Sequence, residues 1–204
     1  MINTPSNGLN NAKVAPIKPV DQFRVLIVYP NLPLMLVPAL SIALFTRILK
    51  QQGYQADLFE TTAYLSDELS SSEERVKMLN ARAFDMGDDL GITIKEDMYG
   101  DFRQKVIKFQ PDFMIFSVVE DAFRQAVSLL SVVEDLNIPH LLGGVFPTNA
   151  ARRCFDFPEV KMIGLGEGER TIIEVAEAIR LGQPLADIPG VHLRMPDGTI
   201  KKNL

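Results

Sequence analysis

Cysteine and histidine are scarce in this sequence, which has one cysteine, Cys154, and two histidines, His140 and His192. A single thiol excludes an internal disulfide and any cysteine-rich zinc or iron–sulfur site within the chain. Two histidines leave little material for a metal centre. We therefore expect both histidines to be packing or surface residues and Cys154 to be a buried thiol.

Positive charge is not in excess either, since the net charge is −5 and the basic residues are scattered. This balance argues against a nucleic-acid partner, because phosphate binding needs a basic face. Residues 1–21 lack the basic stretch and apolar core of a signal peptide, so we expect a cytoplasmic protein. Their Asn, Pro and Ser content, without periodicity, predicts a disordered leader ahead of one domain at residues 22–204.

Charge is absent altogether from Val25 to Thr46, a run long enough to span a bilayer. Asn31 and the prolines at positions 30, 33 and 38 interrupt it, and a proline inside a helix costs roughly 3 kcal/mol. The run is therefore expected to form a strand, a loop and a helix, with no membrane span.

Several motifs of enzymes with α/β folds are missing. No G-x-G-x-x-G follows the first expected strand, and neither a Walker loop nor a nucleophile elbow G-x-S-x-G occurs. The hydroxyl-rich phosphate loop of a flavodoxin and the strand-end aspartate of a receiver domain are absent as well. Nothing in the sequence therefore predicts bond-breaking chemistry by this chain alone.

Short aliphatic runs alternate with amphipathic segments along the chain. The pattern predicts strands at residues 25–28, 54–61, 112–119, 139–142 and 160–163, helices at 39–52, 101–110, 122–136, 148–155 and 171–181, and a hairpin at 191–201. Alternating strands and helices imply right-handed crossovers. The predicted fold is α/β and flavodoxin-like (Rossmann-like), a doubly wound parallel five-stranded sheet with a C-terminal β-hairpin. A helical insertion is expected at residues 62–100, where Ser71 and Glu74 have the spacing of a capping box.

The loops after the strands form the candidate site, because ligands of such sheets bind at the carboxyl ends of the strands. The first loop is apolar and stiffened by proline, which suits a large flat ligand better than a phosphate. The later loops offer a strand-end serine, a glycine pair that lets a bulky group approach the backbone, and a glycine-rich turn whose acids would repel an anion. The candidate residues are Asn31, Leu32, Pro33, Leu34, Met35 and Val37; Ser117, Val118, Val119 and Glu120; Gly143, Gly144, Val145 and Phe146; and Gly164, Gly166, Glu167 and Gly168.

Simpler interpretations of these residues stay open. The first loop could be covered by the insertion or by a domain outside this chain. A lone strand-end serine such as Ser117 bonds the backbone more often than it bonds a ligand. Glu120 and Asp121 are most simply the N-cap and first-turn acids of the next helix.

Several stretches of the sequence are distinctive in combination. They are RVLIVYPNLP, LSIALFTRILKQQGYQADLFE, PDFMIFSVVED, IPHLLGGVFPT, VKMIGLGEGERTIIEVAEAI and IPGVHLRMPDGTIKKN, and together they span about residues 23–203. Together they closely resemble the N-terminal cobalamin-binding domain of cobalamin-dependent radical S-adenosylmethionine enzymes, a family of methyltransferases and ring-forming enzymes. The most specific parts are residues 143–147, the glycine-rich loop at 164–169, and Ile188-Pro-Gly followed by the Asp197-Gly198 hairpin.

The resemblance implies a flavodoxin-like domain in which the nucleotide tail of cobalamin threads between the sheet and its helices. Ser117 would contact the base of the tail, and Gly143 and Gly144 would let the tail pass. Residues 31–37 would lie under the corrin. Many cobalamin domains carry an Asp-x-His-x-x-Gly motif whose histidine ligates cobalt, and it is missing here because no histidine precedes His140. The radical enzymes of the family commonly lack this histidine as well. The resemblance therefore implies base-off cobalamin whose cobalt has no histidine ligand from the protein.

The cluster motif Cys-x-x-x-Cys-x-x-Cys of these enzymes is also missing. The [4Fe-4S] cluster, S-adenosylmethionine and a small-molecule substrate would thus belong to a C-terminal radical domain outside this chain. The predicted function is a cobalamin-binding module of a radical S-adenosylmethionine enzyme, either a methyltransferase or a cyclase, whose catalytic domain is expected outside this chain. One alternative is a cobalamin-free docking module of the same fold. The other is a flavin- or nucleotide-binding flavodoxin-like protein, which the missing phosphate-binding chemistry disfavours.

Overall fold

The computed structural model describes residues 17–33, 39–66, 76–78 and 86–203. In this part of the chain, seven strands form one sheet in the order β2-β1-β3-β4-β5-β6-β7. The strands are β1 (Arg24–Tyr29), β2 (Gln55–Glu60), β3 (Phe113–Ser117), β4 (His140–Gly143), β5 (Met162–Gly164), β6 (Val191–Arg194) and β7 (Ile200–Lys202). The first five pair in parallel and the last two antiparallel, which confirms the predicted fold class. The hairpin extends the same sheet because β6 pairs with β5.

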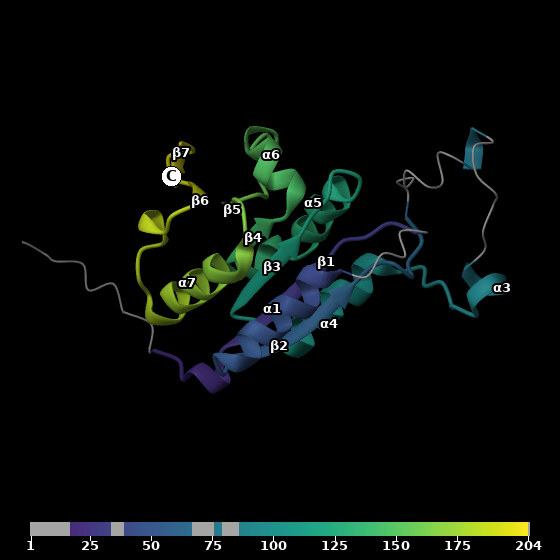
Figure 1. Ribbon diagram of the computed structural model, residues 1–204, viewed down its shortest axis with the longest axis horizontal. Coiled ribbons are helices and arrows are strands. Elements are labelled where there is room, and N and C mark those ends of the chain that lie inside the picture. The colour runs from purple at the N-terminus through teal and green to yellow at the C-terminus, as the bar shows by residue number, and fades with distance from the viewer. Residues whose placement is uncertain (1–16, 34–38, 67–75, 79–85, 204) are drawn as a thin grey trace, which may run out of the picture.

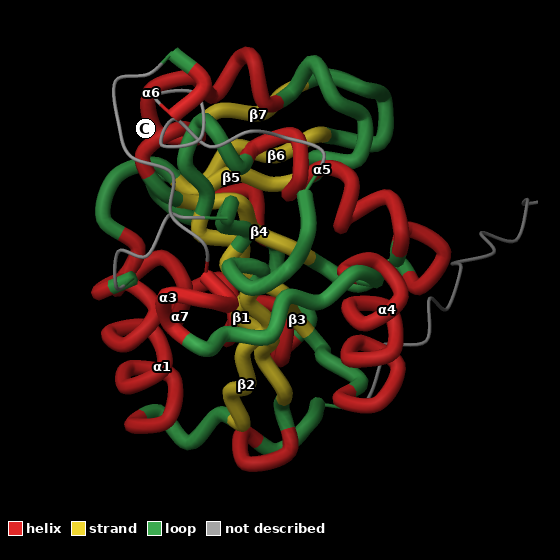
Figure 2. The backbone as a smooth tube through the Cα atoms, turned by 90° about the vertical axis from the view of Figure 1, so that its right-hand side faces the viewer, coloured by secondary structure: helices red, strands yellow, loops and turns green. Residues whose placement is uncertain are grey.

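Helices cover both faces of the sheet (Figures 1 and 2). One face carries α1 (Leu40–Gln51) and α7 (Gly168–Leu181). The other carries α4 (Met98–Phe109), α5 (Phe123–Val132) and α6 (Val145–Cys154). The described residues also include the short 3₁₀ turns η1 (Val20–Gln22), η2 (Glu134–Leu136) and η3 (Leu185–Asp187). The strand order reverses between β1 and β3, so the sheet has its switch point there.

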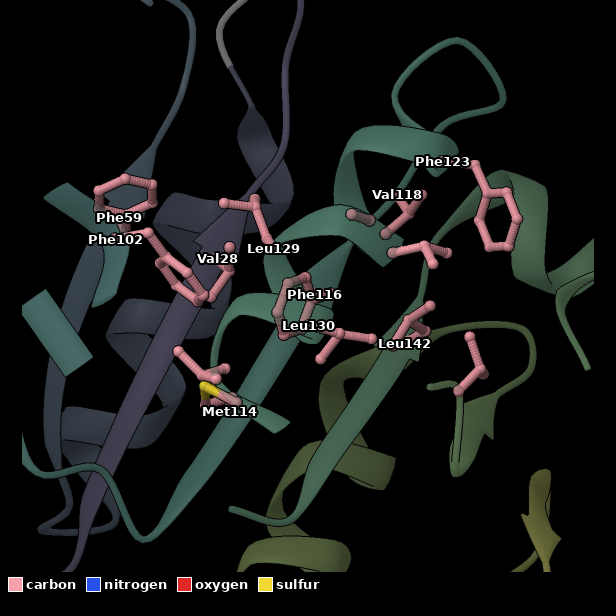
Figure 3. Packing of buried hydrophobic residues seen from close by; sticks show 14 of the residues in the cluster. Val28, Phe59, Phe102, Met114, Phe116, Val118, Phe123, Leu129, Leu130 and Leu142 are labelled. Carbon is pink, nitrogen blue, oxygen red and sulfur yellow. The ribbon is translucent and has the colours of Figure 1, made fainter. Parts of the chain in front are cut away.

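Two clusters of apolar side chains bury the central strands. On the α4 and α5 face, the Phe102 ring lies edge-on to Phe116 with centroids 6.4 Å apart, and Phe59 lies 5.0 Å from Phe102 (Figure 3). On the other face, α1 and α7 cover Ile27 and Ile115. Full burial of one such side chain contributes about 1.5–3 kcal/mol to the stability of the folded protein. This two-sided burial explains why β1 and β3 are continuous apolar runs in the sequence.

The predicted insertion is joined to the domain at its base. The backbones of Tyr64 and Lys95 form a β-bridge, and the Tyr64 hydroxyl donates to Asp101 in α4 over 2.8 Å. The insertion contains α3 (Met86–Leu90), which lies away from the sheet in Figure 1. The capping box expected at residues 71–74 lies outside the described residues.

The described end of the predicted leader differs from the expectation of a disordered segment. The Lys18 ammonium lies 2.7 Å from Asp112, and the Lys18 carbonyl accepts a hydrogen bond from Arg180 of α7. Asp112 also accepts from the Arg24 backbone N–H at the start of β1. Residues 18–21 therefore belong with the domain, because these contacts fix their backbone. Residues 1–16 lie outside the described part of the chain.

The expectation that Glu120 and Asp121 cap the next helix is wrong. A turn after β3 places both acids before the helix, whose N-cap is Ala122 without a side-chain cap bond. The Glu120 backbone carbonyl accepts from the Phe123 N–H at 3.1 Å. Regular α5 ends at Val132, and η2 continues the predicted helical segment to residue 136.

The scarce residues noted in the sequence are packing residues, as predicted. Cys154 is fully buried, and burial raises the pKa of its thiol to about 11. The Nε2 atom of His140 lies 3.0 Å from the backbone carbonyl oxygen of Glu159. His192 in β6 is 6% exposed, and neither of its ring nitrogens has a hydrogen-bond partner among the described residues.

Burial of His192 makes stability depend on pH. Burial and the charge of Lys202 lower the pKa of His192 below its usual 6.5. At a pH between the lowered pKa of His192 in the folded protein and its usual pKa in the unfolded chain, the unfolded chain binds more protons than the folded protein. The free energy of unfolding therefore falls as the pH drops below about 6.5. We expect the free energy of unfolding to decrease from about pH 7.5 to about pH 5.5, and to decrease less in His192→Leu than in the parent protein. Urea unfolding at both pH values measures this difference. Burial also lowers the pKa of His140, but His140 is present in both proteins. If the parent and the variant lose the same free energy of unfolding between these pH values, the assignment to His192 is contradicted.

Candidate binding site at the carboxyl edge of the sheet

A cavity of about 410 Å³ opens at the carboxyl ends of β1, β3, β4 and β5. Its walls come from the sheet, from α1 and α7 on one face, and from the first turns of α6. The lining residues are Tyr29, Ala39, Ser41, Phe45, Ile115, Phe116, Ser117, Val118, Val119, Leu141, Gly143, Gly144, Val145, Thr148, Asn149, Gly164, Leu165, Gly166, Glu167, Gly168, Thr171 and Ile172. The cavity therefore includes the switch point, where ligands of doubly wound sheets bind.

The two glycines after β4 have different roles. A Cβ built on Gly143 would meet only the Gly164 carbonyl, at 4.0 Å, so the missing side chain leaves open space in the cavity. Gly144 has φ of 108°, and a Cβ there would lie 2.6 Å from the carbonyl oxygen of Val118. Only glycine can make this close approach between the ends of β3 and β4. Gly143 thus shapes the cavity, whereas Gly144 is needed for the backbone around it.

The glycine-rich turn after β5 brings two helices to the cavity. A Cβ on Gly168 would lie 2.7 Å from the Phe45 ring, so glycine lets α7 begin directly against α1. The Gly166 N–H donates to the Thr148 hydroxyl at 3.1 Å, which joins this turn to α6. Among the described lining residues, Glu167 carries the charge, and none of them is a lysine, arginine or histidine. The wall therefore does not suit a phosphate dianion.

Several hydroxyl groups line the cavity. The Ser41 hydroxyl from α1 and the Ser117 hydroxyl from β3 lie 3.4 Å apart. At the end of β1, burial and the nearby charge of Glu60 raise the pKa of Tyr29, which keeps its phenol protonated near neutral pH. Ile115, Leu141 and the other apolar lining residues leave the cavity mainly apolar, with hydroxyls at a few points. Such a surface suits a flat, weakly polar group.

Ten of the candidate residues lie together in the cavity wall. They are Ser117, Val118, Val119, Gly143, Gly144, Val145, Gly164, Gly166, Glu167 and Gly168. Whether a ligand contacts them stays a prediction. Leu34, Met35 and Val37 lie outside the described residues.

The other five candidates do not line the cavity. Asn31 is buried beside β2, where its N–H donates to the Thr61 hydroxyl at 2.7 Å, and this bond anchors the start of the first loop. Leu32, which follows it, is fully buried, and Pro33 does not reach the cavity. Glu120 is exposed beyond β3. Phe146 faces α5, with its ring 4.9 Å from that of Phe123.

Sequence reasoning missed lining residues that lie inside helices. Ser41 and Phe45 come from the first turns of α1, Thr148 and Asn149 from α6, and Thr171 from α7. Tyr29, the last residue of β1, was also missed. One signal was present in the sequence, because Ser41 is a hydroxyl within the apolar start of a helix and follows the switch-point strand.

Metal-binding side-chain groups and membrane-spanning helices are both absent from the described residues. Histidine, cysteine, aspartate and glutamate side chains in this part of the chain form no group of three or more that could hold a metal ion. Within the same residues, every helix is too short or too polar to cross a bilayer.

The fold is similar to that of cobalamin-dependent radical enzymes of known structure. The radical S-adenosylmethionine methyltransferase TsrM from Kitasatospora setae, solved with cobalamin and a [4Fe-4S] cluster, superposes with a TM-score of 0.64 over 88% of this chain at 16% identity. The cobalamin-dependent S-adenosylmethionine radical enzyme OxsB, solved with aqua-cobalamin, superposes with a TM-score of 0.59 over 90% of this chain, also at 16% identity. No family profile and no curated protein matches the sequence.

This similarity concerns only part of each enzyme. The chain spans 28% of the TsrM chain and 22% of the OxsB chain in these structures. At this level of identity the similarity shows a shared fold, and function has to be argued from the site.

Proposed function

We propose that this chain is a cobalamin-binding module that works with a radical S-adenosylmethionine domain outside this sequence, in methyl transfer or ring formation. The observation that carries the proposal is the cavity at the switch point, on a fold shared with two cobalamin-binding enzymes. The multidomain size of those enzymes supports a companion domain. That domain would hold the [4Fe-4S] cluster, S-adenosylmethionine and the small-molecule substrate.

The residues of the cavity fit the nucleotide end of cobalamin. Its volume of about 410 Å³ suits a base and a sugar, whereas the larger corrin has to stay at the mouth. Open space beside Gly143, where a built Cβ would meet only the Gly164 carbonyl at 4.0 Å, gives the tail a path along the sheet. Apolar walls at Ile115 and Leu141 suit the flat base, and Ser117 offers a hydroxyl. Within the first loop, Leu34, Met35 and Val37 stay the proposed contacts of the corrin, because Asn31 and Leu32 are buried.

The protein is proposed to leave the cobalt without an imidazole ligand. His140 lies at the start of β4, at the opposite edge of the sheet from the cavity, and His192 is buried in β6. When bound, cobalamin supplies methyl-transfer chemistry at its cobalt. The chain's own part is to bind the cofactor, hold its nucleotide and shield that end from water.

Incubation with hydroxocobalamin followed by gel filtration tests the proposal. We expect about one corrinoid per chain in the protein fraction, with an absorption spectrum that stays the same in His140→Gln and His192→Gln, because neither imidazole reaches the cavity. A shift of the spectrum in either variant would contradict the missing histidine ligand.

Two other results would support the alternatives. Protein that elutes without corrinoid would favour a cobalamin-free docking module of the same fold. A yellow preparation, or one that retains nucleotide, would favour a flavin- or nucleotide-binding protein. The absence of a cationic side chain among the lining residues argues against that last function.

A further inference from the structure

Ser41 and Ser117, which are 76 residues apart in sequence, bring two hydroxyls together in the wall of the cavity. Their oxygen atoms are 3.4 Å apart, whereas a well-formed hydroxyl–hydroxyl bond measures about 2.7 Å. The contact is therefore weak, and both hydroxyls can turn toward a third group. Both residues line the cavity.

The position of Ser41 in α1 is unusual for a serine near a helix start. A serine there commonly caps the helix, but the N-cap of α1 is Ala39 and no side-chain cap bond forms. The described hydrogen bond of Ser41 instead crosses to β3. Its neighbours in the wall include the rings of Phe45 and Tyr29, so a group that reached the two hydroxyls would lie among aromatic and aliphatic side chains.

We propose that Ser41 is a specificity-determining residue that reads, together with Ser117, the edge of a nitrogen-containing aromatic base; the inference rests on the proposed function. Each serine hydroxyl has one donor and two acceptor sites. When the two share one hydrogen bond, one O–H is still free to donate to an unprotonated ring nitrogen. A phenolic base has no ring nitrogen, so it leaves that donor without its partner in an apolar cavity, which is costly. The site therefore favours a benzimidazole or purine base over a phenolic one.

The test compares three corrinoids on the parent protein, Ser41→Ala and Ser41→Thr. The corrinoids are cobalamin, a cobamide with a phenolic base, and cobinamide, which has no nucleotide tail. Dissociation constants from absorption titration are the readout. We expect Ser41→Ala to weaken cobalamin roughly fivefold to tenfold, the usual worth of one hydrogen bond. Cobinamide should bind the variant and the parent equally, and Ser41→Thr, which keeps the hydroxyl, should restore cobalamin binding.

A double-mutant cycle separates a shared hydroxyl pair from two independent contacts. If the serines act as a pair, Ser41→Ala should add little to Ser117→Ala for cobalamin. An equal loss of cobalamin and cobinamide in Ser41→Ala would indicate general damage and overturn the inference. So would an unchanged preference for cobalamin over the phenolic cobamide. Failure of every corrinoid to bind the parent protein would overturn the proposed function itself, and this inference with it.

Discussion

Gly144→Ala lowers the free energy of unfolding by about 3 kcal/mol, the largest stability effect we expect from a single methyl group in this protein. Two costs add at this position. The backbone has φ of 108° and ψ of −173°, a region that is open to glycine alone. The new Cβ would also lie 2.6 Å from the Val118 carbonyl oxygen and 2.9 Å from its nitrogen. Urea unfolding followed by circular dichroism measures the change.

Gly182→Ala is the matched control for this prediction. Gly182 also has a positive φ, of 64°, but it ends α7 and an added Cβ would find no atom within 4 Å. Its substitution should therefore cost only about 1 kcal/mol, from backbone strain without a clash. Equal losses in the two variants would show that the contact between Gly144 and Val118 does not hold the ends of β3 and β4 together.

Gly143→Leu should abolish most corrinoid binding while the protein still folds. Gly143 is not in the left-handed region, and the space beside it is open as far as Gly164, so the backbone accepts a side chain. A leucine there fills the path proposed for the nucleotide tail. A steric clash of this kind costs about 1–3 kcal/mol, which corresponds to about fivefold to 150-fold in the dissociation constant for cobalamin.

Gly143→Ala provides the graded control, since one methyl group fills little of that space. We expect it to bind hydroxocobalamin nearly as well as the parent, with the same thermal unfolding midpoint. Cobinamide, which has no tail to place, should bind all three proteins alike. If Gly143→Leu retains cobalamin with parental affinity, the tail does not pass this glycine.

The candidate site was only partly predictable from the sequence. The strand ends were found from local patterns, because a run such as FMIFS predicts a buried strand, and whatever follows it reaches the carboxyl edge. Whether a side chain after the strand points into the cavity or away from it depends on the residues of other elements that it contacts. Phe146 was a candidate because it follows the glycine pair, yet it packs on Phe123 of α5. Asn31 was a candidate as the start of the first loop, yet Thr61 beyond β2 holds it.

The sequence by itself determined the succession of strands and helices along the chain and the two-sided burial of the central strands, because these depend on neighbours along the chain. The tertiary structure decided which residues share the cavity. Ser41 meets Ser117, 76 residues away, only after α1 packs on the sheet beside the end of β3. The antiparallel hairpin likewise joined the sheet because β5 had a free edge for β6. Contacts of this kind arise from packing between elements, and no local pattern of residues encodes them.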